Sequence, residues 1–204
     1  MTVDRVMMER LLLRVEMTAH RRGWDVEGRL CLLYDWHDQV TERAYRLLTE
    51  GDPIRCGAYA AKTAVLLPGN AAHRMFGLAL VLSKTEDGAA GMLLDMFRRP
   101  GFLGAALVFE AWDREESQDE PEGDVRVADM PGSLEGRYVV AATVDGTDCW
   151  VRRIRGEKAS VMTDYAHTCG GAIIESLRVF VAKVAGLPVP ELTVVPTRWG
   201  DETA

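Results

Sequence analysis

The sequence predicts an α+β fold in a single domain: an antiparallel β-meander of about four to five strands, packed by an N-terminal and a C-terminal helix. Three observations favour this class. Apolar and charged residues recur at helical spacing near both ends of the chain, β-rich segments gather in the second half, and two of these segments flank an Asp-Gly pair. The 204 residues, 48% of them hydrophobic, are enough to build one core without disulfides.

The N-terminal third predicts a helix, a strand and a second helix. Residues 3–21 have an amphipathic pattern that ends at Gly23, where a helix stop signal follows two arginines. Gly28 precedes an apolar segment, residues 29–34, that is typical of a short buried strand. Residues 38–50 again show helical spacing, and Gly51-Asp52-Pro53 ends that helix.

The pattern is weaker between residues 54 and 101. Residues 64–67 fit either a strand or the end of a buried helix. Asn70 is a suitable N-cap for a helix reaching about Ser83, and residues 89–98 predict a further short helix that ends before Pro100-Gly101.

The second half predicts most of the sheet. Residues 103–112 predict a central strand, and 113–129 form a charged, acidic segment that we expect to be a mobile loop. Residues 138–144 and 147–154 predict a hairpin, 159–163 a shorter strand, and 171–185 a helix that stops at Gly186. The domain therefore spans residues 1–187, and 188–204 form an extended, proline-containing tail.

The turn at Asp145-Gly146 is the best-specified local feature, because both central residues of a type I′ turn need positive φ. A two-residue loop places Val140 opposite Val151 and Tyr138 opposite Arg153. One face of the hairpin is then core. The opposite face, which we interpret as half-covered or functional, carries Arg137, Val139, Ala141, Trp150 and Arg152.

Two groups of residues are candidates for a binding site. The first combines Glu110 with the arginines of the hairpin (Arg137, Arg152 and Arg153), which could form an anion site flanked by Trp112 or Trp150. Cross-strand ion pairing at a sheet edge is the favoured explanation for this group. The second is His167 and Cys169 before the last helix, where a helix N-terminus lowers a thiol pKa. An ordinary helix entry capped by Thr168 is favoured there.

Composition argues against several classes of function. The net charge of −7 opposes nucleic-acid binding and adhesion to anionic membranes. The four cysteines are widely spaced without zinc-type spacing, so we expect reduced thiols and a cytoplasmic protein with no metal site and no cofactor. The acidic segment lacks the central glycine and final glutamate of an EF-hand loop. No apolar run is long enough to span a bilayer.

Several short segments carry a family resemblance. They are Arg22-Gly23-Trp24-Asp25, residues 104–112, residues 135–142 with Asp145-Gly146, and Arg155-Gly156. In this order they resemble small uncharacterised proteins of actinobacteria and their phages, over about half of the chain in patches. The resemblance implies a source and no reaction.

No residues in the sequence are assigned a catalytic role, so the leading hypothesis is a non-enzymatic protein that binds a protein partner or itself. Five tryptophans support it, since tryptophan is enriched at interfaces. A phage-encoded modulator or a homodimer would fit. The alternative is an anion- or small-molecule-binding protein, or an enzyme, with its site at Trp150 and Arg152 or at Cys169. Nucleic-acid binding by Arg152, Arg153 and Arg155 is the third hypothesis.

Overall fold

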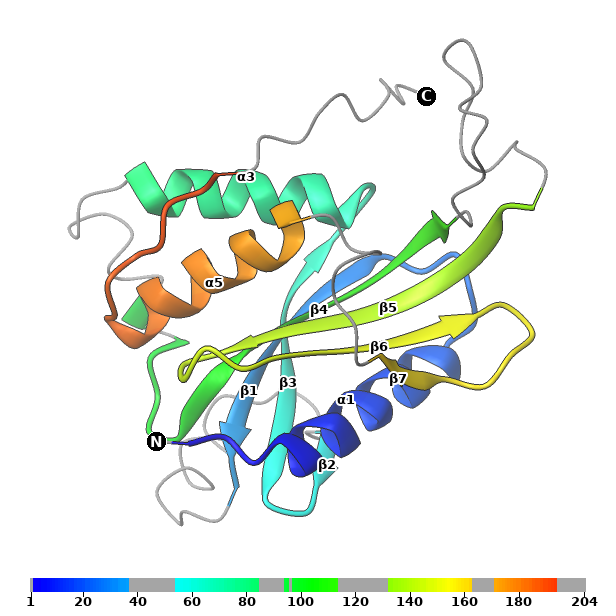
Figure 1. Ribbon diagram of the computed structural model, residues 1–204, viewed down its shortest axis with the longest axis horizontal. Coiled ribbons are helices and arrows are strands. Elements are labelled where there is room, and N and C mark those ends of the chain that lie inside the picture. The colour runs from blue at the N-terminus through cyan, green and yellow to red at the C-terminus, as the bar shows by residue number, and fades with distance from the viewer. Residues whose placement is uncertain are drawn as a thin grey trace, which may run out of the picture.

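The computed structural model describes residues 2–36, 54–84, 94–95, 97–113, 132–162 and 171–193. Within them, one seven-stranded antiparallel sheet curls into a half-barrel (Figure 1), with the strand order β2-β3-β1-β4-β5-β6-β7. The strands are β1 (Gly28–Asp35), β2 (Ile54–Cys56), β3 (Tyr59–Leu67), β4 (Phe102–Asp113), β5 (Leu134–Thr143), β6 (Asp148–Ile154) and β7 (Ser160–Met162). The α+β class and the antiparallel sheet are confirmed.

The expected number of four to five strands was too low. β2 has only three residues, too few for an alternating pattern to be recognised. β3 contains Tyr-Ala-Ala-Lys-Thr-Ala, and alanine and lysine are poor strand formers. Its pairing with β1 on one side and with β2 on the other decides its structure, so residues 64–67 are a strand and not the end of a helix.

Helices cover both faces of the sheet (Figure 1). α1 (Arg5–His20) lies on one face, while α3 (Ala71–Lys84) and α5 (Gly171–Ala185) pack together on the other. The sequence patterns predicted all three helices, although only the N-terminal and C-terminal helices were expected to pack on the sheet. The predicted helix at 38–50, most of that at 89–98, and the acidic segment 114–129 lie outside the described residues.

Local capping explains where two of the helices begin. The Asp4 carboxylate accepts hydrogen bonds from the amides of Val6 and Met7, which have no partner inside α1. Asn70 accepts one from the amide of His73 and caps α3 as predicted. α1 then buries an apolar face that includes Met8, Leu11, Leu12, Val15 and Ala19.

Each face of the sheet has its own hydrophobic core. The α3–α5 face includes Tyr34, Leu107, Tyr138, Val140 and Trp150. The α1 face includes Cys31, Leu33, Val108, Val139 and Val151. Both faces are therefore buried over the central strands, and β1, β4 and β5 show nearly continuous burial instead of alternation.

The hairpin turn is confirmed, but the predicted register was wrong by one residue. The Thr143 amide donates to the Thr147 carbonyl and the Gly146 amide donates to the Thr143 carbonyl, so the loop has three residues. Gly146 has a φ of 82°, as a three-residue loop with a left-handed last position requires. Val140 consequently faces Trp150, and Arg137 faces Arg153.

This one-residue change separates the residues that were expected to share a mixed face. Side chains alternate along a strand, so a slip of one moves a whole strand's side chains to the other face. Trp150 lies on the α3–α5 face with Tyr138, whereas Arg137 lies on the α1 face. Arg137 therefore does not share a face with Trp150 and Arg152.

The Asp145 carboxylate makes the stability of the turn depend on pH. Partial burial alone would raise the pKa of its carboxyl. Hydrogen bonds from the Val3 amide at 2.6 Å, from the Thr143 hydroxyl and from the Thr147 amide outweigh that effect and lower the pKa to about 2. The carboxylate also joins the residues before α1 to the hairpin.

We expect Asp145→Ala to lower the free energy of unfolding by roughly 1 kcal/mol at neutral pH. The loss is modest because Asp145 is exposed and solvent screens its charge. The folded-state pKa lies below the ordinary value of 3.8, so the stabilisation is complete above pH 3.8 and is lost as pH falls toward 2. Urea unfolding at pH 7 and pH 2 measures it. A difference between wild type and variant that is equal at both pH values would contradict this role.

Candidate functional site

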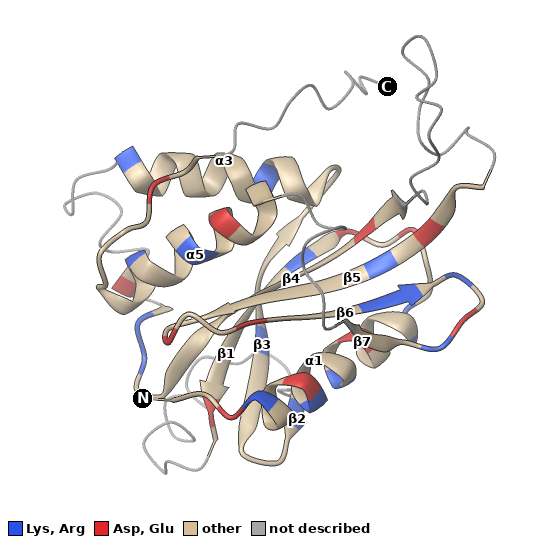
Figure 2. Cartoon of the chain, in the orientation of Figure 1, with Lys and Arg blue, Asp and Glu red and all other residues tan. Residues whose placement is uncertain are grey.

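Charged residues occur on β4, β5 and β6 at the end of the sheet that lies near the C-terminal end of α1 (Figure 2). There the end of α1 and the following turn, residues 21–27, meet the Trp112 end of β4 and the neighbouring parts of β5 and β6. Two arrangements lie side by side in this region: an internally paired ion network, and a hollow lined by arginines.

Glu16 is the centre of the ion network. It is completely buried on the inner face of α1. The Arg153 guanidinium binds it with two hydrogen bonds of 2.6 Å, and Arg137, also completely buried, lies 3.8 Å from the same carboxylate. The hydrogen bond to Glu16 raises the pKa of Arg153, so this guanidinium stays charged.

The network continues outward through Arg137. Its Nε donates to Glu110 at 3.0 Å, directly across the β4–β5 pair, and its Nη2 also donates to the Gly23 carbonyl. The ring of Trp24 lies between two cations, 4.6 Å from the Arg137 Cζ and 4.9 Å from the Arg155 Cζ. These contacts fix the turn after α1 on the sheet.

Three carboxylates at the rim lie close enough together to hold a metal ion. Oxygens of Asp25, Glu110 and Glu135 are within 4.8 Å of one another. Arg155, however, pairs with both Asp25 and Glu135, and Glu110 accepts from Arg137 and from the Asp25 amide. Burial, with Asp25 and Glu110 nearby, raises the pKa of Glu135. Each of the three carboxylates is therefore already paired with an internal arginine, and we assign the group a structural role.

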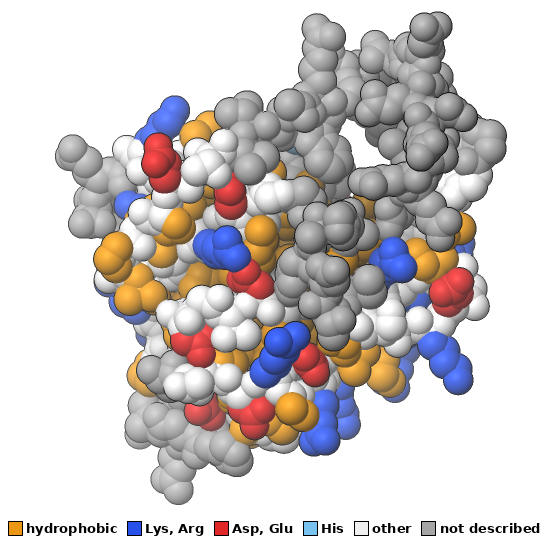
Figure 3. All heavy atoms as spheres, in the orientation of Figure 1, with side chains coloured by type: hydrophobic (Ala, Val, Ile, Leu, Met, Phe, Trp, Pro, Cys, Tyr) orange, Lys and Arg blue, Asp and Glu red, His pale blue; other side chains and the backbone are white. Residues whose placement is uncertain are grey.

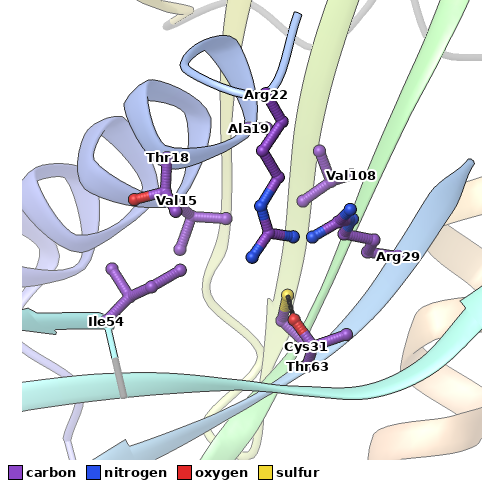
Figure 4. A pocket seen from close by; sticks show the side chains of 9 residues that line it. All are labelled: Val15, Thr18, Ala19, Arg22, Arg29, Cys31, Ile54, Thr63 and Val108. Atoms are coloured by element: carbon purple, nitrogen blue, oxygen red, sulfur yellow. Dashed lines mark hydrogen bonds between the residues drawn. The ribbon is translucent and has the colours of Figure 1, made fainter. Parts of the chain in front are cut away.

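The second arrangement is a small hollow between α1 and the sheet (Figure 4). Arg22 reaches down from the end of α1 and Arg29 reaches in from β1, so the two guanidiniums point toward one another above Cys31 and Thr63. The cavity measures about 20 Å³, room for about one water-sized group. It is lined by Val15, Thr18, Ala19, Arg22, Arg29, Cys31, Ile54, Thr63 and Val108.

The charges of this hollow are unbalanced. The lining contains two arginines and no carboxylate. Over the described residues, neither arginine forms an ion pair, and the buried Nε of Arg29 has no hydrogen-bond acceptor. By contrast Arg5, Arg98, Arg137, Arg153, Arg155 and Arg178 each pair with a carboxylate. Two adjacent cations in a partly desolvated site favour a bound anion.

Cys31 supplies no nucleophile in the hollow. Burial raises the pKa of the thiol to about 11, although the hydrogen bond with the Thr63 hydroxyl and the charge of Arg22 each lower it. The thiol is therefore protonated at neutral pH, and thiols in this form are weak nucleophiles. Among the described residues, the lining also contains no histidine, aspartate or glutamate that could act as a general base.

The structure brings only some of the residues predicted as a site together. Glu110 and Arg137 form the cross-strand ion pair that was the favoured explanation. Trp112 stands on β4 with 47% of its surface exposed, and Trp150 is buried in the core of the opposite face at 1% exposure. Arg152 is partly buried on β6, opposite Tyr138. His167 and Cys169 lie outside the described residues, so that hypothesis stays a prediction.

Sequence reasoning missed Arg22 and Arg29. Arg22 was assigned to the helix stop signal and Arg29 to the start of a strand. Both interpretations are correct, since Arg22 follows the C-cap of α1 and Arg29 is the second residue of β1. The usable signal was that both arginines flank one short turn, which brings their side chains to the same end of the sheet.

Comparison with known proteins gives no match to a family model, a curated protein or a solved structure. The resemblance to actinobacterial and phage proteins therefore stays a prediction. Among the described helices, none combines the length and apolar character needed to cross a membrane.

Proposed function

We propose that this chain is a non-enzymatic binding protein that recognises an anionic group, a carboxylate or a phosphate, in the hollow between Arg22 and Arg29. The observation that carries the proposal is the pair of converging guanidiniums, which have no carboxylate partner in the part of the chain that the structure describes, in a protein of net charge −7. Guanidinium N–H groups form strong, directional bonds to such oxyanions.

The surroundings favour binding over catalysis. The arginines can stabilise negative charge, but the Cys31 thiol is protonated and the described lining residues include no general base that could activate a substrate. The small size of the cavity admits only one or two oxygens of the anion, with the rest of the ligand outside.

Isothermal titration calorimetry with inorganic phosphate tests the proposal. We expect Arg22→Gln and Arg29→Gln each to weaken binding about tenfold or more, because each removes charge-assisted hydrogen bonds. Arg74→Gln is the matched control, since Arg74 is exposed on α3 at the opposite face of the sheet. Phosphate binding that is absent from the wild type, or unchanged in the double variant, would rule out the site.

A further inference from the structure

A larger groove lies beside the arginine hollow, along α1. The groove measures about 480 Å³ and lies between α1 and the edge strand β2, where it is lined by Arg14, Met17, Thr18, Arg21, Ile54 and Arg55. Thr18 and Ile54 line both spaces, so the groove and the hollow adjoin one another.

The groove is as basic as the hollow. Arg14 and Arg21 form no ion pair within the described part of the chain, and Arg55 stacks on Trp36, with its Cζ 3.9 Å from the ring centroid. With Arg22 and Arg29, five arginines that have no carboxylate partner among the described residues therefore line these two adjoining spaces. On the face shown in Figure 3, Lys and Arg side chains gather along the edge over α1.

The floor of the groove is aliphatic. Met17 is 45% exposed although methionine is usually buried, and Ile54 lies between the two spaces. An alternation of cationic and aliphatic groups complements a segment with acidic and aliphatic residues. A nucleic acid would instead require stacking surfaces for its bases, and no aromatic side chain lines either space in the part of the chain that is described.

The dimensions of the groove fit a short length of extended chain. Arg14 and Arg21 are seven residues apart on α1, which corresponds to about 10 Å at 1.5 Å per residue. An extended peptide covers this distance in about three residues. The hollow, at the Arg22 end, would then receive the terminal oxygens of one anionic side chain of that peptide.

We propose that the partner is a protein: an acidic, extended segment lies along α1 in the groove and places its most strongly anionic side chain between Arg22 and Arg29. This inference rests on the proposed function and specifies the class of its ligand. Charge complementarity holds locally, because the five arginines are clustered, while the net negative charge of the whole chain disfavours long polyanions.

Fluorescence anisotropy with the full chain tests this. The probes are fluorescein-labelled Glu-Leu-Glu-Ser-Glu-Leu-Glu, the same peptide with phosphoserine, and labelled octathymidylate. We expect both peptides to bind more tightly than the oligonucleotide, and the phosphopeptide to bind most tightly. Arg14→Glu and Met17→Glu should each weaken peptide binding about tenfold, and affinity should fall with added salt.

Arg74→Glu is the control, since it makes the same charge change on the opposite face of the sheet and should leave peptide affinity within twofold. Circular dichroism confirms that each variant is folded. Tighter binding of the oligonucleotide, no peptide binding, or equal effects of Arg14→Glu and Arg74→Glu would overturn the inference. Phosphate binding at the hollow without peptide binding would overturn the peptide alone and leave the proposed function intact.

Discussion

Glu16→Gln is expected to lower the free energy of unfolding by about 3–5 kcal/mol, which for a chain of this size corresponds to roughly 10 °C in Tm. Glu16 is fully buried and is the shared acceptor of Arg137 and Arg153. Glutamine keeps the shape of the side chain but removes its charge. Arg137 would then remain fully buried with Glu110 as its single carboxylate partner.

Glu9→Gln is the matched control for this prediction. Glu9 is also on α1 and pairs with an arginine, but the Arg5–Glu9 pair is exposed, so its removal should cost less than 1 kcal/mol. Chemical denaturation of both variants measures the difference. The double variant Glu16→Gln, Arg137→Met should be less destabilised than the sum of the single changes, because it removes a buried cation together with its partner. Equal effects of Glu16→Gln and Glu9→Gln would show that burial does not matter here.

Trp150→Ala is expected to be similarly destabilising, at about 3–5 kcal/mol, because it leaves a large cavity in the core beneath α5. Trp150 is the largest fully buried side chain, and its ring stacks on Tyr138, which stacks in turn on Phe109. The three rings thus join β6, β5 and β4 through side chains on one face of the sheet.

Trp112→Ala tests whether burial explains that loss. Trp112 is 47% exposed near the end of β4, so its removal should change the free energy of unfolding by less than about 1 kcal/mol. Trp150→Phe should recover part of the lost stability by filling part of the cavity. If Trp150→Ala and Trp112→Ala have the same effect, Trp150 is not the core residue that the register places there.

Local sequence patterns predicted the individual elements better than their assembly. The periodicity of α1, the Asn70 cap of α3 and the Asp145-Gly146 turn were all confirmed, because each depends on residues close together in the chain. β2 and β3 carry no comparable pattern. β3 depends on pairing with β1, which is remote in sequence, and β2 is a three-residue edge strand that pairs with β3, so no local window contains the signal for both.

The candidate site shows the same division. The cross-strand pair of Glu110 and Arg137 could be predicted from two strands and a turn. Their third partner, Glu16, could not, because it comes from α1 and meets them only when the helix packs on the sheet. The arginine hollow likewise requires α1, β1, β2 and β3 to meet, and each contributes too few lining residues to form a motif.

The sequence by itself therefore determined the α+β class, the antiparallel pairing of the second half, and the position of the hairpin turn. Tertiary structure decided which faces the strands present. A three-residue loop in place of a two-residue loop shifts the register by one residue, so the side chains of one strand change faces relative to the other strand. Only packing against helices on both faces of the sheet selects between the two registers. That choice placed Trp150 in a core and Arg137 in an ion network, whereas the packing of α1 on the sheet brought Arg22 and Arg29 together at the surface that we propose binds a partner.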